Sequence, residues 1–151
     1  MAMKLCIAVV MDPIETIKTA KDTTFAMMLE AQRRGHSLFY IVPGSLSLRQ
    51  GNSFATLIDI KVKDDIYHYV SFGNPTECSL TEMDVILMRK DPPVDAQFIN
   101  DTQILSIAES EGVLVVNRPQ GLRDFNEKLA ALLFPQCCPE TLVSRNVTQF
   151  K

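Results

Sequence analysis

A charged cluster follows an apolar run near the middle of the chain. Val85–Met88 is apolar without alternation, and the next three residues, Arg89–Asp91, are all charged and are followed by two prolines. An unbroken apolar run is typical of a strand that is covered on both faces of a parallel sheet. Ligands of open parallel sheets bind just beyond the carboxyl ends of the strands. We therefore expect Arg89 to face a ligand.

Two further polar loops follow apolar runs in the same way. Asp12–Thr24 comes after Leu5–Met11, and Asn117–Gly121 comes after Val113–Val116. If these runs are parallel strands, the three loops leave the same edge of the sheet and face one crevice. Their mixed charges would suit a small zwitterion that carries carboxylates and an ammonium group. The alternative is that these are ordinary solvated charges, since loops are polar by default.

The apolar runs alternate with segments of helical periodicity, which predicts an α/β fold with a mostly parallel sheet flanked by helices. Asp22 and Asp95 can each cap a helix, and Gly35 and Gly112 stand where these two helices would end. The buried strands would be Leu5–Met11, Leu38–Val42, Val85–Met88 and Val113–Val116. A third helix is predicted from a single apolar stripe of Leu122, Phe125, Leu129, Leu132 and Leu133.

Alternating residues between the second and third buried strands indicate strands with one wet face. Leu46–Arg49 and Ala55–Lys63 are separated by a turn-forming Gln-Gly-Asn sequence, which predicts a small antiparallel hairpin at a sheet edge. Tyr67–Phe72 can add another such strand. Gly73–Leu80 is predicted to be a loop.

The composition predicts one compact domain. The chain has 151 residues, of which 46% are hydrophobic and 22% are charged, as in globular proteins. Its net charge is −3 and no Lys or Arg stripe is present, which argues against nucleic acid and anionic membranes as partners. No apolar run is long enough to span a bilayer, and the first residues lack an export signal, so we expect a cytoplasmic location.

Neither a metal site nor a phosphate-binding loop is predicted. The four cysteines have no ligand-like spacing among themselves or with the two histidines, so we expect reduced thiols and no metal. The six glycines are scattered singly, without a glycine-rich loop that could cradle a phosphate. Nucleotide binding by this chain alone is therefore not expected.

Eight stretches of the sequence together carry a family pattern: Met11–Ile14, Lys21–Met27, Leu29–Gly35, Asp84–Pro93, Val116–Asp124, Asn126–Leu129, Pro139–Val143 and Arg145-Asn146. In register over essentially the whole chain, they resemble the amino-terminal region of bacterial glutathione synthetase. The resemblance is weakest between Ser45 and Thr81.

The resemblance implies an ATP-grasp ligase that joins γ-glutamylcysteine to glycine and requires ATP and Mg²⁺ when complete. Residues 1–122 would form a Rossmann-like pre-ATP-grasp substrate domain. Residues 123–151 would form the crossing helix and the start of the ATP-grasp region. The family's glycine-rich lid loop and metal ligands would lie after Lys151, so the chain resembles the front part of a longer enzyme. We expect it to be inactive alone, to hold neither ATP nor Mg²⁺, and to form a homo-oligomer as part of the complete enzyme.

Site residues follow from the same resemblance. Arg89 matches the family's arginine that binds the γ-glutamylcysteine moiety, and a guanidinium can hold a carboxylate through two parallel bonds. Asp12, Lys21 and Asp22 lie in the loop that resembles the segment beside the peptide substrate. Lys128 matches a family lysine that contacts ATP. No catalytic residue and no metal ligand is expected in this chain.

Two other interpretations remain open. The chain can be a non-catalytic α/β binding or assembly domain from a truncated or split ATP-grasp ligase gene, which pairs with a partner chain. It can also belong to a sister ATP-grasp ligase that joins other amino acids, although the residues of Asp84–Pro93 argue against this.

Overall fold

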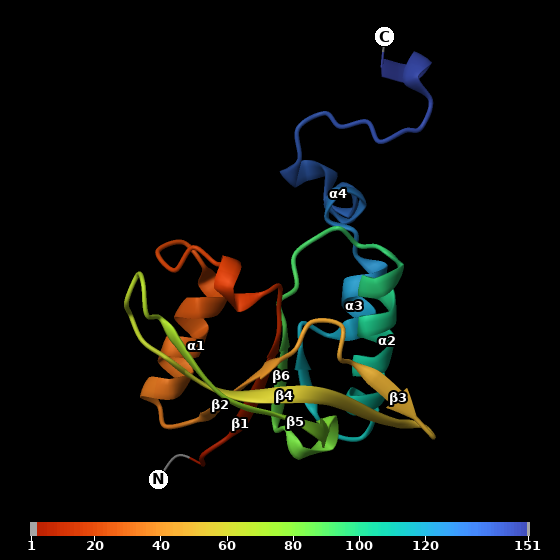
Figure 1. Cartoon of the computed structure of the whole chain (residues 1–151). Helices are drawn as coiled ribbons and strands as arrows, with labels where there is room; N and C mark the ends of the chain where they lie inside the picture. The colour runs from red at the N-terminus through yellow and green to blue at the C-terminus, as the bar shows by residue number, and fades with distance from the viewer. Residues whose placement is uncertain (1–2, 151) are drawn as a thin grey trace.

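A seven-stranded sheet organises the protein, with helices packed on both of its faces (Figure 1). The computed structural model describes residues 3–150. Its strands are β1 (Cys6–Val10), β2 (Ser37–Ile41), β3 (Ser47–Arg49), β4 (Asn52–Val62), β5 (Val70–Ser79), β6 (Val85–Met88) and β7 (Leu114–Val116). Its α-helices are α1 (Thr23–Arg33), α2 (Ala96–Ser110), α3 (Pro119–Asp124) and α4 (Glu127–Ala130). Short 3-10 helices are η1 (Ile14–Thr16), η2 (Leu80–Glu82), η3 (Ala131–Leu133), η4 (Pro135–Cys137) and η5 (Val147–Phe150).

The parallel part of the sheet forms the centre of the molecule. Strand order is β3-β4-β2-β1-β6-β7, with β5 also paired to β4. β1 pairs in parallel with β2 and β6, and β6 pairs in parallel with β7. The predicted α/β class with a mostly parallel sheet and flanking helices is confirmed.

Alternate residues of β1 supply two separate cores. Ile7 and Val9 pack with Phe25 and Met28 of α1 on one face. Ala8 packs with residues of α2 on the other face, and it is fully buried, as is Val9. Apolar side chains therefore cover both sides of this strand, which explains why its sequence lacks alternation. Figure 1 shows α1 on one side of the sheet and α2 with α3 on the other.

The two longest helices begin and end at the residues that the sequence indicates. The Asp22 carboxylate accepts a hydrogen bond from the Phe25 amide at 2.7 Å, and α1 is followed by Gly35 with φ 87°. Asp95 caps α2 in the same way, and Gly112 with φ 103° follows that helix. Positive φ favours glycine at both ends, because other residues meet a steric penalty there.

The antiparallel part of the sheet is larger than predicted. The β3–β4 hairpin is confirmed, and its turn has φ 51° at Gln50 and 85° at Gly51. The loop expected at Gly73–Leu80 is wrong, because β5 extends from Val70 to Ser79 along β4. Pro75 pairs with Ile58 beside a register shift in which β5 has one residue more than β4, and an edge strand tolerates proline at such a place.

Two predictions for the C-terminal third are also wrong. The strand β7 is not buried on both faces, because it forms the sheet edge and leaves Leu114 59% exposed. The third helix is interrupted: α3 ends at Asp124, and the Asn126 side chain then caps α4 through the amides of Lys128 and Leu129. The expected apolar stripe is therefore split, and Leu129 is exposed.

No helix within residues 3–150 has the length and apolar character that a membrane crossing requires. After α3, the chain leads through α4 and short 3-10 helices away from the sheet (Figure 1).

The Gln32 side chain fastens the end of α1 to β4. Its amide nitrogen donates to the Val62 carbonyl at 2.7 Å, and its amide oxygen accepts from the Val62 N–H at 2.8 Å. We expect Gln32→Ala to lower the free energy of unfolding by about 1–3 kcal/mol, because it leaves both backbone groups unpaired. Urea unfolding measures this loss. Gln103→Ala on the exposed face of α2 is the control and should change stability by less than about 0.5 kcal/mol; equal losses would contradict the role of Gln32.

Glu30 is paired with two arginines at the end of α1. Its carboxylate accepts from Arg33 and Arg34, each at 2.7 Å. The hydrogen bonds from these guanidiniums lower the pKa of Glu30 from 4.5 to about 2. The pairing therefore stabilises the fold above about pH 4.5 and is lost as the pH falls toward 2. An NMR titration should give this low midpoint, and Arg33→Gln should raise it; an ordinary midpoint in the unmodified protein would contradict the pairing.

Candidate functional site

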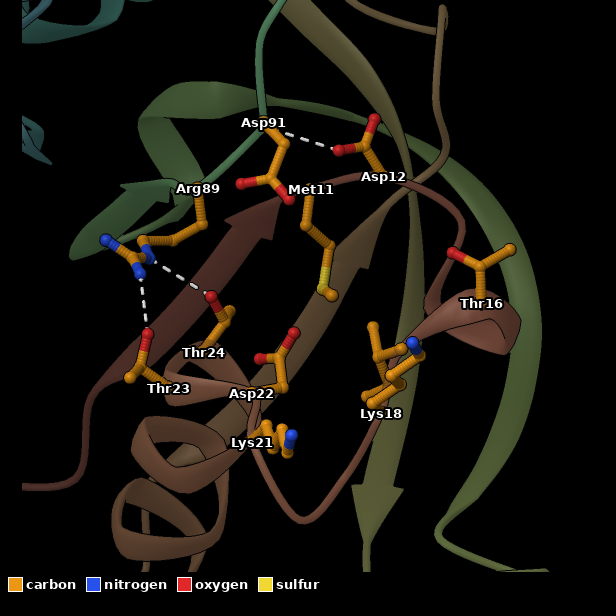
Figure 2. A pocket seen from close by; sticks show the side chains of 11 residues that line it. Met11, Asp12, Thr16, Lys18, Lys21, Asp22, Thr23, Thr24, Arg89 and Asp91 are labelled. Carbon is orange, nitrogen blue, oxygen red and sulfur yellow. Dashed lines mark hydrogen bonds between the residues drawn. The ribbon is translucent and has the colours of Figure 1, made fainter.

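The candidate site lies at the carboxyl ends of β1 and β6. Val10 is in register with Met88, and the Arg89 N–H donates to the Val10 carbonyl at 2.7 Å. The loops that follow the two strands therefore start side by side and enclose a pocket of about 390 Å³ (Figure 2). The pocket is lined by Met11, Asp12, Thr16, Ile17, Lys18, Lys21, Asp22, Thr23, Thr24, Arg89 and Asp91.

Arg89 is held against the first turn of α1. Its Nε donates to the Thr24 hydroxyl at 3.0 Å, and a terminal nitrogen donates to the Thr23 hydroxyl at 2.9 Å. Thr24 is buried and Arg89 is half-buried. Within residues 3–150, Arg89 forms no salt bridge. The guanidinium thus lines the pocket, and its two hydrogen bonds to Thr23 and Thr24 go to neutral hydroxyl groups.

The acidic residues of the pocket also shape its loops. An Asp12 carboxylate oxygen accepts from the Asp91 N–H at 3.0 Å, which ties the loop after β1 to the loop after β6. Asp22 caps α1, as described above. Both predicted site residues therefore have a structural contact in addition to their predicted role toward substrate. Figure 2 shows the Asp91 side chain turned into the pocket beside Met11.

Two lysines supply further positive charge. Lys18 and Lys21 are exposed and line the pocket from the segment between η1 and α1. Figure 2 shows them on the side of the pocket opposite Asp91. The formal charges of Lys18, Lys21 and Arg89 balance those of the three aspartates, so the pocket offers both cations and anions to a ligand.

The structure brings together four of the five predicted binding residues. Asp12, Lys21, Asp22 and Arg89 all line this pocket, whereas Lys128 lies on α4 outside the lining. Their roles toward a ligand stay predictions.

The third predicted loop, Asn117–Gly121, does not line the pocket either. β7 is separated from β1 by β6, which places the end of β7 about 10 Å from that of β1. Arg118 in this loop is instead near Glu109 of α2, at 3.4 Å. The loops after β1 and β6 therefore border one pocket, and the prediction that Asn117–Gly121 would also border it is wrong.

Sequence reasoning missed the two threonines that hold Arg89. The sequence places Thr23 and Thr24 at the end of the Asp12–Thr24 loop and assigns them no binding role, yet their hydroxyls accept hydrogen bonds from the guanidinium. Their position directly after the helix cap was the available signal, because the first turn of that helix faces the carboxyl edge of the sheet. Within the described part of the chain, no three His, Cys, Asp or Glu side chains are grouped to hold a metal ion.

The sequence was compared with known proteins. The family described as "Prokaryotic glutathione synthetase, N-terminal domain" matches residues 4–123. The glutathione synthetase of Xanthomonas axonopodis pv. citri is 58% identical over 149 residues, which cover 99% of this chain and 47% of that protein. The glutathione synthetase of Xylella fastidiosa (strain 9a5c) is 57% identical over 149 residues, which cover 99% of this chain and 48% of that protein. The glutathione synthetase of Escherichia coli O157:H7 is 49% identical over 145 residues, which cover 96% of this chain and 46% of that protein.

The chain thus spans about half the length of the curated relatives it matches. The family match covers the sheet, α1, α2 and the pocket described above. Because it includes well over half of the chain, the chain belongs to the prokaryotic glutathione synthetase family and corresponds to its N-terminal domain.

Proposed function

We propose that this chain is the substrate-binding part of a glutathione synthetase and that its pocket binds γ-glutamylcysteine. In the complete enzyme, ATP would phosphorylate the cysteinyl carboxylate, and the amine of glycine would attack the acyl phosphate. The products would be glutathione, ADP and phosphate. The observation that carries the proposal is Arg89, a half-buried guanidinium that lines the pocket and has no salt bridge within residues 3–150.

A carboxylate is the ligand group that suits this guanidinium best. Arg89 already donates twice to threonine hydroxyls, which hold its plane in a fixed orientation. A guanidinium has five N–H donors, so further donors are available to a carboxylate. Charge-assisted bonds of this type are about twice as strong as neutral ones. The threonines therefore pre-organise the group, and less side-chain entropy is lost when a carboxylate binds.

The remaining charges of the pocket match the rest of the dipeptide. γ-Glutamylcysteine carries two carboxylates and one ammonium group. Arg89 and the lysines Lys18 and Lys21 can bind the carboxylates, and the Asp91 carboxylate can accept from the ammonium group. Both signs of charge are needed to orient a zwitterion, which an all-basic phosphate site would not provide.

ATP, Mg²⁺ and glycine would bind mainly through other parts of the complete enzyme. Among the described residues, Lys128 is the one for which we propose an ATP contact, and a single lysine offers few of the contacts a nucleotide needs. We therefore propose that this chain alone is inactive. We also propose a cytoplasmic location and a homo-oligomeric state for the complete enzyme.

The role of Arg89 can be tested by kinetics of the complete enzyme. We expect Arg89→Ala to raise KM for γ-glutamylcysteine far more than KM for ATP. The loss of binding free energy should be about 2–5 kcal/mol if the ion pair between Arg89 and the dipeptide carboxylate is shielded from water. Arg89→Lys should recover only part of this loss, because an ammonium group cannot form two parallel bonds to a carboxylate. Arg118→Ala is the control, since Arg118 is exposed and lies outside the pocket. Equal effects of Arg89→Ala on both substrates would count against the proposal.

A further inference from the structure

Lys90, the residue after Arg89, forms a salt bridge with α2, which packs on the face of the sheet opposite to α1. Lys90 Nζ lies 3.0 Å from an Asp101 carboxylate oxygen, and Asp101 belongs to α2. The other oxygen of Asp101 accepts from the Gln97 side chain at 2.9 Å. The Asp101 side chain is only 5% exposed, so this is a buried carboxylate with both oxygens bonded.

This pair is connected to the pocket through the backbone of one short segment. Successive residues of an extended strand point to opposite faces, so Arg89 faces α1 when Lys90 faces α2. Arg89 continues the ladder of β6, because its N–H bonds the Val10 carbonyl. Rotation of the segment about its axis would therefore move both side chains together. Next along the chain, the Asp91 N–H is held by Asp12 (Figure 2).

Stability alone does not account for such a pair. Replacing a buried ion pair with apolar residues of similar size is often neutral or stabilising, because the two charges lose their hydration in the folded protein. In some proteins, buried polar or ionic groups instead specify one arrangement of the structure over others. The Lys90–Asp101 pair joins the carboxyl end of β6 to α2 at the point where the backbone turns from the sheet into the pocket loop.

We propose that Lys90 and Asp101 are positioning residues that hold Arg89 in its binding orientation. Lys90 and Asp101 do not line the pocket and would not touch the dipeptide. They act through the backbone that Lys90 shares with Arg89. The effect on dipeptide affinity rests on the proposed function, whereas the effect on the order of Arg89 does not.

The test measures the Arg89 Nε–H signal by NMR in this chain without ligand. In the unmodified protein this proton bonds Thr24, so it should exchange slowly with water. We expect Asp101→Asn, and the double variant Lys90→Met with Asp101→Leu, to exchange this proton at least about fivefold faster, because the pocket segment opens locally more often. The double variant removes both charges, so no unpaired buried charge remains to unfold it. Lys90→Arg keeps the pair and should exchange like the unmodified protein.

Two controls separate positioning from general loosening. Glu109→Gln removes a carboxylate from the same helix outside the pocket, and Gln32→Ala weakens the fold at the last turn of α1. Both should leave the Arg89 Nε–H exchange unchanged. The inference is overturned if the double variant keeps slow exchange, if it does not fold, or if Gln32→Ala accelerates the exchange as much.

Calorimetry of the complete enzyme and its variants with γ-glutamylcysteine adds the functional readout. We expect the double variant to weaken binding about tenfold, as a small misplacement of a binding group does. If the unmodified protein does not bind the dipeptide, the proposed function fails, and the exchange data still decide the positioning role. If it binds, and the double variant binds equally well, the positioning role is overturned and the proposed function stands.

Discussion

The parallel pairing of β1 with β6 is the constraint on which the site depends. It brings together two loops that are more than sixty residues apart in sequence and places their first residues side by side. Both strands are covered by apolar side chains on their two faces, so the sheet cannot shift without exposing a core. The pocket is therefore built at the ends of strands that are packed on both faces, and such rigid elements can hold a binding group accurately.

Three successive residues show how the sheet is converted into a binding surface. Arg89 bonds the threonines of α1, Lys90 bonds Asp101 of α2, and the Asp91 amide bonds Asp12 of the neighbouring loop. Each residue is attached to a different element, so the segment has little freedom to turn. Within residues 3–150, the Arg89 guanidinium held in this way bonds hydroxyl groups and forms no salt bridge. A cation that is already ordered suits a carboxylate ligand, because its side chain loses little conformational entropy when the ligand binds.

Sequence reasoning identified the strands and helices where one principle dominated. The unbroken apolar runs of β1, β2 and β6 and the caps at Asp22 and Asp95 have a single physical interpretation, and the structure confirms them. The predictions of secondary structure were wrong where tertiary contacts override the local conformational preference of the residues. β5 contains Gly and Pro but is held as a strand by its long pairing with β4. The stripe after Gly121 predicted one helix, although the Asn126 side chain begins a new one.

The candidate site was predictable in part. That polar loops at the carboxyl ends of the strands would meet followed from the parallel order, and Arg89 could be chosen because it directly follows a buried strand. The helix cap at Asp22 indicates that Thr23 and Thr24 lie at the carboxyl edge of the sheet. It does not reveal that they bond Arg89, because hydroxyl contacts between residues 65 and 66 positions apart leave no local pattern. The Lys90–Asp101 pair could not be predicted either, because it depends on how α2 packs on the sheet.

The most direct measurement is a crystal structure of the complete enzyme with γ-glutamylcysteine bound. The account predicts a dipeptide carboxylate about 2.7–2.9 Å from the Arg89 guanidinium nitrogens, with the threonine contacts of that side chain retained. A dipeptide bound elsewhere in the enzyme, with Arg89 contacting only Thr23 and Thr24, would contradict it.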